Sequence, residues 1–230
     1  MHPLDNVIWE ALTTRHAHFA ESHGEARRFV RDVGPLGAFR EHGPRGYESL
    51  AGLVRPEDTV GLFLDEPYEE RPGWDFVVGA PLLQMIADNG IAARTSPEKN
   101  HEIVELDPRD SAEMIELTSL TKPGPFGPRT HELGKYLGIR KDGKLVAMAG
   151  ERLKVPGHTE VSAVCTHPEH TGKGYARVLM TEIMRGIRER GETPFLHSRG
   201  DNTRAIALYK LLGFRERKMG HFAVLRKTEY

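Results

Sequence analysis

The second half of the chain shows regular spacing of hydrophobic and polar positions, and this spacing predicts its elements. Apolar residues recur at three- and four-residue steps over residues 175–190, which predicts an amphipathic helix. Two apolar-rich segments, residues 136–140 and 145–153, flank the pair Asp142 and Gly143. Because Asp-Gly favours a tight two-residue turn, these segments predict a β-hairpin.

The apolar pattern of residues 159–166 predicts a strand in the middle of a sheet. By simple alternation Val161, Ala163 and Cys165 share one face, and Val164 lies on the other. A strand with apolar residues on both faces is typically covered on both sides. We therefore expect this strand to be central.

The remaining elements of residues 101–230 follow from shorter patterns and from breakers. The segment 122–129 holds three prolines and two glycines, so a helix before it must end there. Asn202 is a suitable cap for a last helix that ends at Gly213. We predict helices over residues 107–120 and 203–212, and strands over residues 101–106, 194–198, 214–217 and 222–226.

Residues 1–100 are less regular and contain no chemical motif. We predict a helix over residues 16–29, a strand over 59–64, and a helix over 81–87 that begins with proline. The polar segment 95–100 breaks the pattern. It divides the chain into an N-terminal α/β region, residues 1–100, and a regular domain, residues 101–230.

Composition narrows the class of protein. The chain has 230 residues, and its 32 basic and 33 acidic side chains give a net charge of −1, which argues against nucleic acid or an anionic membrane as a partner. No apolar stretch has the length of a membrane span, and the N-terminus lacks the pattern of a signal peptide. Its single cysteine excludes an internal disulfide and fits a cytoplasmic protein.

A glycine-spaced loop lies between the strand at 159–166 and the helix at 175–190. Gly172 and Gly174 permit backbone angles that other residues resist, and the helix that follows directs free N–H groups to the same point. Gly-x-Gly alone is also typical of a plain tight turn. The strand before it and the helix after it favour a site for a phosphorylated cofactor, where Lys173 either adds positive charge or is simply solvated.

Two motifs in this order resemble the GNAT superfamily of N-acetyltransferases over residues 101–230. The family's loop Gln/Arg-x-x-Gly-x-Gly/Ala aligns with Thr171, Gly172, Lys173, Gly174, Tyr175 and Ala176, and Thr171 departs from the preferred Gln or Arg. The family's second signature, Asn-x-x-Ala-x-x-Leu-Tyr-x-x-Leu-Gly-Phe, is matched in full by Asn202, Ala205, Leu208, Tyr209, Leu212, Gly213 and Phe214.

The resemblance implies an α/β (α+β) fold: a mixed, mostly antiparallel sheet with a splayed parallel strand pair and flanking helices. The splayed strands would be residues 159–166 and 194–198, with acetyl-CoA as co-substrate between them. The backbone of the first strand would pair with the pantetheine arm and the loop amides would hold the pyrophosphate. The implied cofactor-binding residues are Val164, Cys165, Thr166, Thr171, Gly172, Lys173, Gly174, Tyr175, Ala176, Asn202 and Ala205.

The resemblance also implies that Tyr209 protonates the departing thiolate, although periodicity alone indicates a core tyrosine. A phenol with a pKa of about 10 suits that task. A general base must take a proton from the acceptor amine. Glu151 is the base we expect, because its strand flanks the cleft. Glu160, His158 and His197 are alternatives, and each is also readable as a solvated surface group.

Other candidate residues have plainer interpretations. Cys165 is expected to be a small buried residue rather than a nucleophile. His167 and His170 lack further ligands at metal-binding spacing, so we expect no metal. The segment 122–129 is either an acceptor-binding loop, in which Arg129 would select a carboxylate, or a rigid connection.

The sequence therefore predicts a cytoplasmic acyltransferase that moves acetyl from acetyl-CoA to a primary amine by direct attack in a ternary complex. The acceptor is a small-molecule or peptide amine, and a homodimer is compatible with the sequence. One alternative is a non-catalytic acyl-CoA-binding sensor. The other is an interaction domain whose glycine loop is only structural. The N-terminal region is either a degenerate half-copy of the same fold or a cap on the acceptor site.

Overall fold

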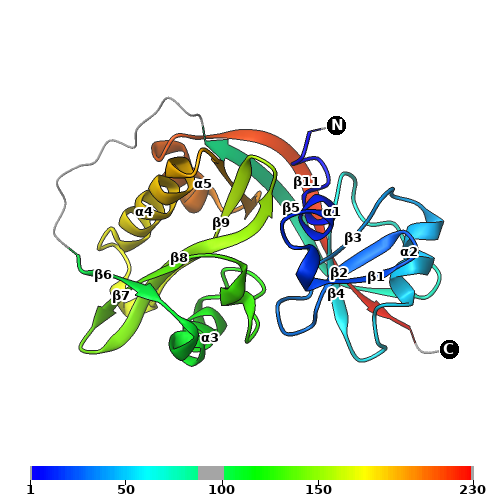
Figure 1. Ribbon diagram of the computed structural model, residues 1–230, viewed down its shortest axis with the longest axis horizontal. Helices are drawn as coiled ribbons and strands as arrows, with labels where there is room; N and C mark the ends of the chain where they lie inside the picture. Colours follow the sequence, from blue (N-terminus) through cyan, green and yellow to red (C-terminus); the bar gives the residue numbers. More distant parts are fainter. Residues whose placement is uncertain (1, 88–100, 229–230) are drawn as a thin grey trace.

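One eight-stranded sheet organises the computed structural model, which describes residues 2–87 and 101–228 (Figure 1). In spatial order its strands are β4 (Thr59–Leu64), β11 (Phe214–Lys227), β5 (Trp74–Ala87), β10 (Thr193–Arg199), β9 (His158–Thr166), β8 (Lys144–Val155), β7 (Tyr136–Lys141) and β6 (Ile103–Leu106). Neighbours are antiparallel except β9 and β10, which are parallel. The predicted mixed sheet with one parallel pair is confirmed.

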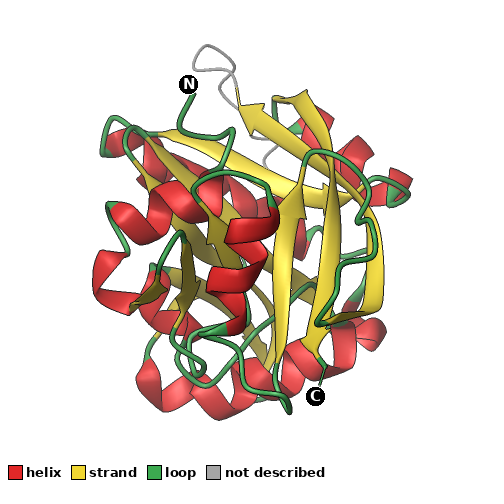
Figure 2. Ribbon diagram, turned by 90° about the vertical axis from the view of Figure 1, so that its right-hand side faces the viewer, coloured by secondary structure: helices red, strands yellow, loops and turns green. Residues whose placement is uncertain are grey.

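Helices border the strands on several sides (Figure 2). They are α1 (Val7–Thr13), α2 (Pro44–Ala51), α3 (Ser111–Thr121), α4 (Tyr175–Glu189) and α5 (Thr203–Leu211), with single 3₁₀ turns at η1 (Ala17–Phe19), η2 (Pro108–Asp110), η3 (Thr130–Leu133) and η4 (Pro168–His170). A second sheet contains β1 (Ala20–His23), β2 (Ala26–Phe29) and β3 (Gly37–Phe39). No helix of the described residues is both long and apolar enough to cross a bilayer.

The helices α4 and α3 cover opposite faces of the sheet. Leu179 and Ile183 of α4 pack in one core with Leu196 of β10. Met114 and Leu117 of α3 belong to a different core. The structure confirms three predicted elements, with small shifts of their ends: the amphipathic helix over residues 175–190, the hairpin, and the strand over 59–64.

Strands from both predicted regions join the same sheet. β11 pairs with β5 from Phe214 opposite Ala87 to Lys227 opposite Trp74, and β4 pairs with the other edge of β11. The predicted boundary at residues 95–100 lies outside the described residues. The two closing strands predicted over residues 214–217 and 222–226 are one continuous strand, with a bulge between Glu216 and Lys218.

Both helices predicted in the N-terminal region are wrong. Residues 81–87 belong to β5, where Leu83 and Met85 enter the α4 core and Ile86 packs on the other face. A short apolar run does not distinguish helix from strand, and here pairing with β10 and β11 decides it. Residues 16–29 form η1 and the hairpin of β1 and β2, which turns at Gly24 with φ +49°.

Candidate functional site

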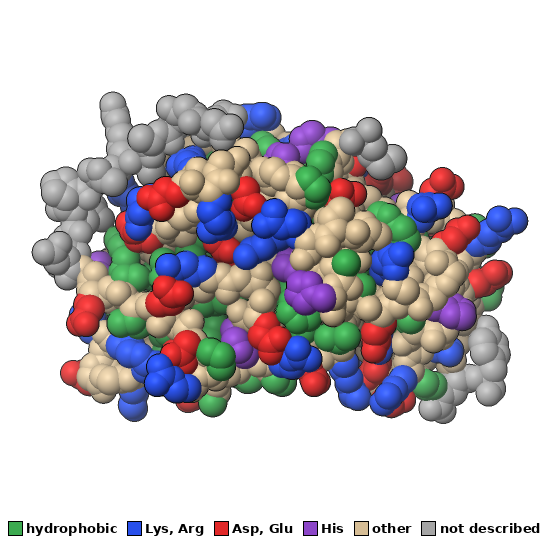
Figure 3. Space-filling view, in the orientation of Figure 1, with side chains coloured by type: hydrophobic (Ala, Val, Ile, Leu, Met, Phe, Trp, Pro, Cys, Tyr) green, Lys and Arg blue, Asp and Glu red, His purple; other side chains and the backbone are tan. Residues whose placement is uncertain are grey.

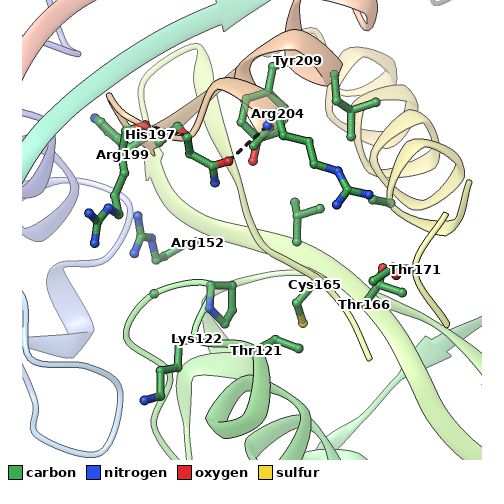
Figure 4. A pocket seen from close by; sticks show the side chains of 18 of the residues that line it. Thr121, Lys122, Arg152, Cys165, Thr166, Thr171, His197, Arg199, Arg204 and Tyr209 are labelled. Carbon is green, nitrogen blue, oxygen red and sulfur yellow. Dashed lines mark hydrogen bonds between the residues drawn. The ribbon is translucent and has the colours of Figure 1, made fainter. Parts of the chain in front are cut away.

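The parallel strands β9 and β10 separate and leave a large cavity between their ends. They pair only from His158 opposite Thr193 to Glu160 opposite Phe195. Beyond that point lies a cavity of about 1460 Å³. It is lined by Val164, Cys165 and Thr166 of β9 and by His197, Ser198 and Arg199 of β10 (Figure 4). The predicted splay is present, and one edge of β9 is unpaired along it.

A β-bulge at Ala163 accompanies the divergence. Ala163 has φ +52°, and the register with β8 places Ala163 and Val164 opposite one residue, between the pairs Met148–Cys165 and Gly150–Ser162. The extra residue reverses the alternation of side chains. Val161 therefore packs in the α4 core with Val164, whereas Ala163 and Cys165 pack in the α3 core. The single face predicted for Val161, Ala163 and Cys165 is wrong for this reason.

The glycine loop borders one end of the cavity. Gly172 and Gly174 have φ +77° and +83°, in the left-handed region that favours glycine. Gly174 is the N-cap of α4 and provides no side-chain cap, so the first amides of this 15-residue helix remain available. Thr171, Gly172, Lys173, Gly174, Tyr175 and Ala176 all line the cavity. Such a helix start favours a bound anion.

The helix α5 brings the second motif to the same cavity. Asn202 caps the helix, and its Oδ1 accepts from the backbone N–H of Ala205 at 3.2 Å, drawn as a dashed line in Figure 4. Asn202, Ala205 and Tyr209 line the cavity. Burial raises the pKa of Tyr209, so its phenol stays protonated at neutral pH.

An ionic network lies where the strands β9 and β10 begin to separate. Arg152 donates through Nε and Nη2 to the two oxygens of Glu160, both at 2.8 Å, and His197 Nδ1 lies 2.7 Å from Glu160 Oε1. Burial alone would raise the pKa of Glu160, but the charge and hydrogen bonds of Arg152, with help from His197, lower it to about 2. Glu160 is therefore ionised, and its oxygens are occupied by protein donors.

Gln84 of β5 sets the tautomer of His197. The Gln84 carbonyl oxygen accepts from Arg217 at 2.7 Å, and its amide nitrogen donates to the backbone oxygen of Leu4 at 3.0 Å. These partners orient the amide, so its nitrogen also donates to His197 Nε2, 3.0 Å away. The imidazole proton then lies on Nδ1, toward Glu160.

The other predicted bases lie outside the cavity. Glu151 is nearly buried, and its oxygens lie 2.8 Å from Arg190 and 2.9 Å from Lys154. Burial would raise the pKa of Glu151, but these two cations lower it overall. His158 packs beside His2 and does not line the cavity either. Of the four candidate bases, only His197 does.

The proline-rich segment contributes one wall. Its residues Lys122, Pro123, Gly124 and Pro125 line the cavity. Arg129 does not: its guanidinium pairs with Glu132 at 2.8 Å and lies over the ring of Phe19.

The lining of the cavity is rich in cations. Among the described lining residues none is Asp or Glu, and the cations are Lys122, Arg152, Lys173, Arg177, Arg199 and Arg204. On the face shown in Figure 3, basic and acidic side chains are mixed, in keeping with the net charge of −1. The excess in the cavity is therefore local. Sequence reasoning missed Arg152, Arg199 and Arg204, because no motif distinguishes them from surface arginines.

Cys165 is buried between the cavity and α3. Burial raises the pKa of its thiol to about 11, so the thiol is protonated at neutral pH. The geometry agrees with a small packing residue.

Three possible metal-ligand side chains do gather at η4, one of them on the residue that precedes it. His167, Glu169 and His170 bring ligand atoms within 4.8 Å of one another. However, the Lys173 ammonium lies 3.3 Å from His170 Nδ1, and a cation there would repel a metal ion.

Comparisons with known proteins agree with this geometry. Residues 136–223 match the family described as FR47-like protein. The N-alpha-acetyltransferase RimI of Mycobacterium tuberculosis is 32% identical over 132 residues, which are 54% of this chain and 82% of that protein. A Novosphingobium aromaticivorans protein assigned to the GNAT family of acetyltransferases has a crystal structure that is 38% identical, covers 100% of both chains and has a TM-score of 0.90.

A more distant structure shares the fold alone. The GCN5-related N-acetyltransferase from Kribbella flavida is 18% identical, with 98% of this chain and 97% of that chain covered, and a TM-score of 0.61.

Proposed function

The chain belongs to the GNAT family of acetyltransferases, and we propose that it transfers acetyl from acetyl-CoA to a primary amine by direct attack in a ternary complex. The observation that carries this proposal is the cavity between β9 and β10, which joins the glycine loop to Tyr209. The RimI relative is named an N-alpha-acetyltransferase, which supports an α-amino group as the acceptor.

The residues present fit acetyl-CoA. Along Val164, Cys165 and Thr166 one edge of β9 no longer pairs with β10, and the backbone groups on that edge need partners that the pantetheine amides can supply. The left-handed glycines Gly172 and Gly174 would let the backbone approach the pyrophosphate. Lys173, Arg177 and Arg204 would offset phosphate charge.

In this proposal the neutral amine attacks the thioester carbonyl carbon, and the C–S bond breaks. Amides of β9 near Val164 polarise the carbonyl, as donors of an oxyanion hole do. Tyr209 then donates its proton to the departing thiolate, a role suited to a phenol that is protonated at neutral pH.

We assign no base role to Glu151, because two cations hold its carboxylate outside the cavity. Glu160 and His197 are also poor bases here, since protein donors occupy the Glu160 oxygens and the His197 Nε2. The acceptor proton is instead lost to solvent. A cation-rich lining assists this step because it disfavours the ammonium form of the amine.

Calorimetric titration with acetyl-CoA, followed by a screen of amines for release of free CoA thiol, tests the proposal. Binding in the micromolar range with thiol release would support an acetyltransferase. Binding without thiol release would favour the acyl-CoA sensor. Absence of binding would refute the cofactor site built on Gly172, Gly174 and Asn202.

A further inference from the structure

A partly buried guanidinium with free donors faces the cavity away from the glycine loop. The Arg152 side chain is only 11% exposed, and its Nε and Nη2 donate hydrogen bonds to Glu160. Within the part of the chain that the structure describes, its Nη1 has no hydrogen-bond partner. Because the bidentate pair fixes the plane of the guanidinium, the Nη1 donors are held in position. This arrangement suits an anionic group of a ligand.

Two further cations lie at the same end. Lys122 follows α3 in a left-handed conformation, φ +49°, which its backbone N–H stabilises by donating to the Thr118 oxygen at 2.7 Å. Its side chain is exposed and has no carboxylate partner among the described residues. Among the residues that the structure describes, Arg199 pairs only with Asp201, and that pair is largely solvated, with side chains 67% and 62% exposed. Such a pair is weak and leaves Arg199 available.

These cations are separate from those at the cofactor loop. Figure 4 shows Arg152, Arg199 and Lys122 on the opposite side of the cavity from Thr166 and Thr171. Lys173 and Arg177 lie in or beside the loop itself. The phosphates of a cofactor seated on the glycine loop would therefore be met by the loop cations. The opposite group remains for the acceptor.

We propose that the acceptor is a small amine that also carries an anionic group, either a carboxylate or a phosphate, bound by Arg152 Nη1, Lys122 and Arg199. This inference rests on the proposed acetyl transfer and names the substrate class of that site. The anionic group is attracted by the three cations. The amine of the same molecule is favoured in its neutral, reactive form because no described lining residue is a carboxylate that could stabilise an ammonium.

The test compares matched pairs of acceptors that differ only in the anion. Amino acids are compared with their carboxamides, and O-phosphoethanolamine with ethanolamine, as kcat/KM from thiol release at saturating acetyl-CoA. A polyamine and a neutral alanine-initiated peptide complete the panel. We expect the anionic member of the reactive pair to be preferred about tenfold or more, in line with hydrogen bonds to charged groups. The pair that shows the preference distinguishes carboxylate from phosphate.

Variants connect the preference to these residues. Replacing Arg152 would leave Glu160 buried without its partner, so the exposed residues carry the test. Lys122→Gln and Arg199→Gln should each lower the ratio of kcat/KM for the anionic over the neutral acceptor about fivefold, the upper range for exposed charges. Lys144→Gln and Arg185→Gln are matched controls outside the cavity and should leave the ratio unchanged.

Three results would overturn the inference. The first is a preference for the polyamine, the neutral peptide or the carboxamides. The second is binding of acetyl-CoA with no thiol release for any anionic amine. The third is a ratio of kcat/KM for the anionic over the neutral acceptor that Lys122→Gln and Arg199→Gln do not change. All three leave acetyl-CoA binding intact. Absence of acetyl-CoA binding would instead refute the proposed function.

Discussion

His16 provides a pH-dependent link between the N-terminal segment and the strand that carries Arg152. The imidazole is buried against Phe19 and Phe29, and its Nε2 lies 2.9 Å from the Arg152 carbonyl oxygen and 3.1 Å from the Lys154 amide nitrogen. Burial, with smaller contributions from Lys154, His18 and Arg15, lowers the pKa of His16 from 6.5 to about 4, although the Arg152 carbonyl acts in the opposite direction.

The sign follows from proton linkage. Between pH 6.5 and about 4, the unfolded chain binds a proton at His16 and the folded chain does not. The unfolding free energy is therefore highest above pH 6.5 and falls as the pH is lowered through this range. A shift of this size corresponds to about 3 kcal/mol of unfolding free energy. About 2 kcal/mol of it should be lost by about pH 5.

The assay is urea unfolding followed by tryptophan fluorescence between about pH 7.5 and pH 5. His16→Gln removes the titrating group, so its unfolding free energy should decline about 2 kcal/mol less over this range than that of the wild type. His18→Gln is the control, because that side chain is exposed two residues away. Equal pH dependence in the wild type and His16→Gln would refute the reasoning.

Four other predictions concern the cavity and the ionic network beside it. Tyr209→Phe should lower kcat about 100-fold with acetyl-CoA affinity nearly intact by calorimetry, and unchanged turnover would remove Tyr209 from the mechanism. Gly174→Val should weaken acetyl-CoA binding about tenfold, because φ +83° strains a β-branched residue; equal affinity would contradict the loop assignment. Cys165→Ala should retain turnover within a few-fold, whereas a nucleophile would lose nearly all. Glu160→Gln should cost about 3–5 kcal/mol in urea unfolding by leaving Arg152 unpaired; a loss below about 1 kcal/mol would contradict this.

Local patterns predicted the elements whose structure depends on near neighbours. The α4 helix, the β7–β8 hairpin and the strand β9 follow from periodicity and from the Asp142-Gly143 turn. The Asn202 cap is a contact across three residues, and the structure contains it. The positions of the glycine loop and of the second motif, residues 202–214, at one cavity follow from the order of elements that the family resemblance supplied.

Periodicity failed where distant contacts or an irregularity decided the outcome. Residues 81–87 have an apolar run that suits a helix, yet they form part of β5 because they pair with the neighbouring strands β10 and β11. The bulge at Ala163 reverses the face of β9, and a single residue in the left-handed region leaves no mark on the hydrophobic pattern.

The sequence by itself determined the main helix, the hairpin and the glycine loop of this protein, since each depends on residues close together in the chain. Only the tertiary structure decided that Arg152 pairs with Glu160 and that Gln84 orients His197. It alone brought Lys122, Arg152 and Arg199 from three distant places in the chain to one cavity. The physical reason is that charge and hydrogen bonding act through space, so the partners of a side chain are set by how strands and loops pack together.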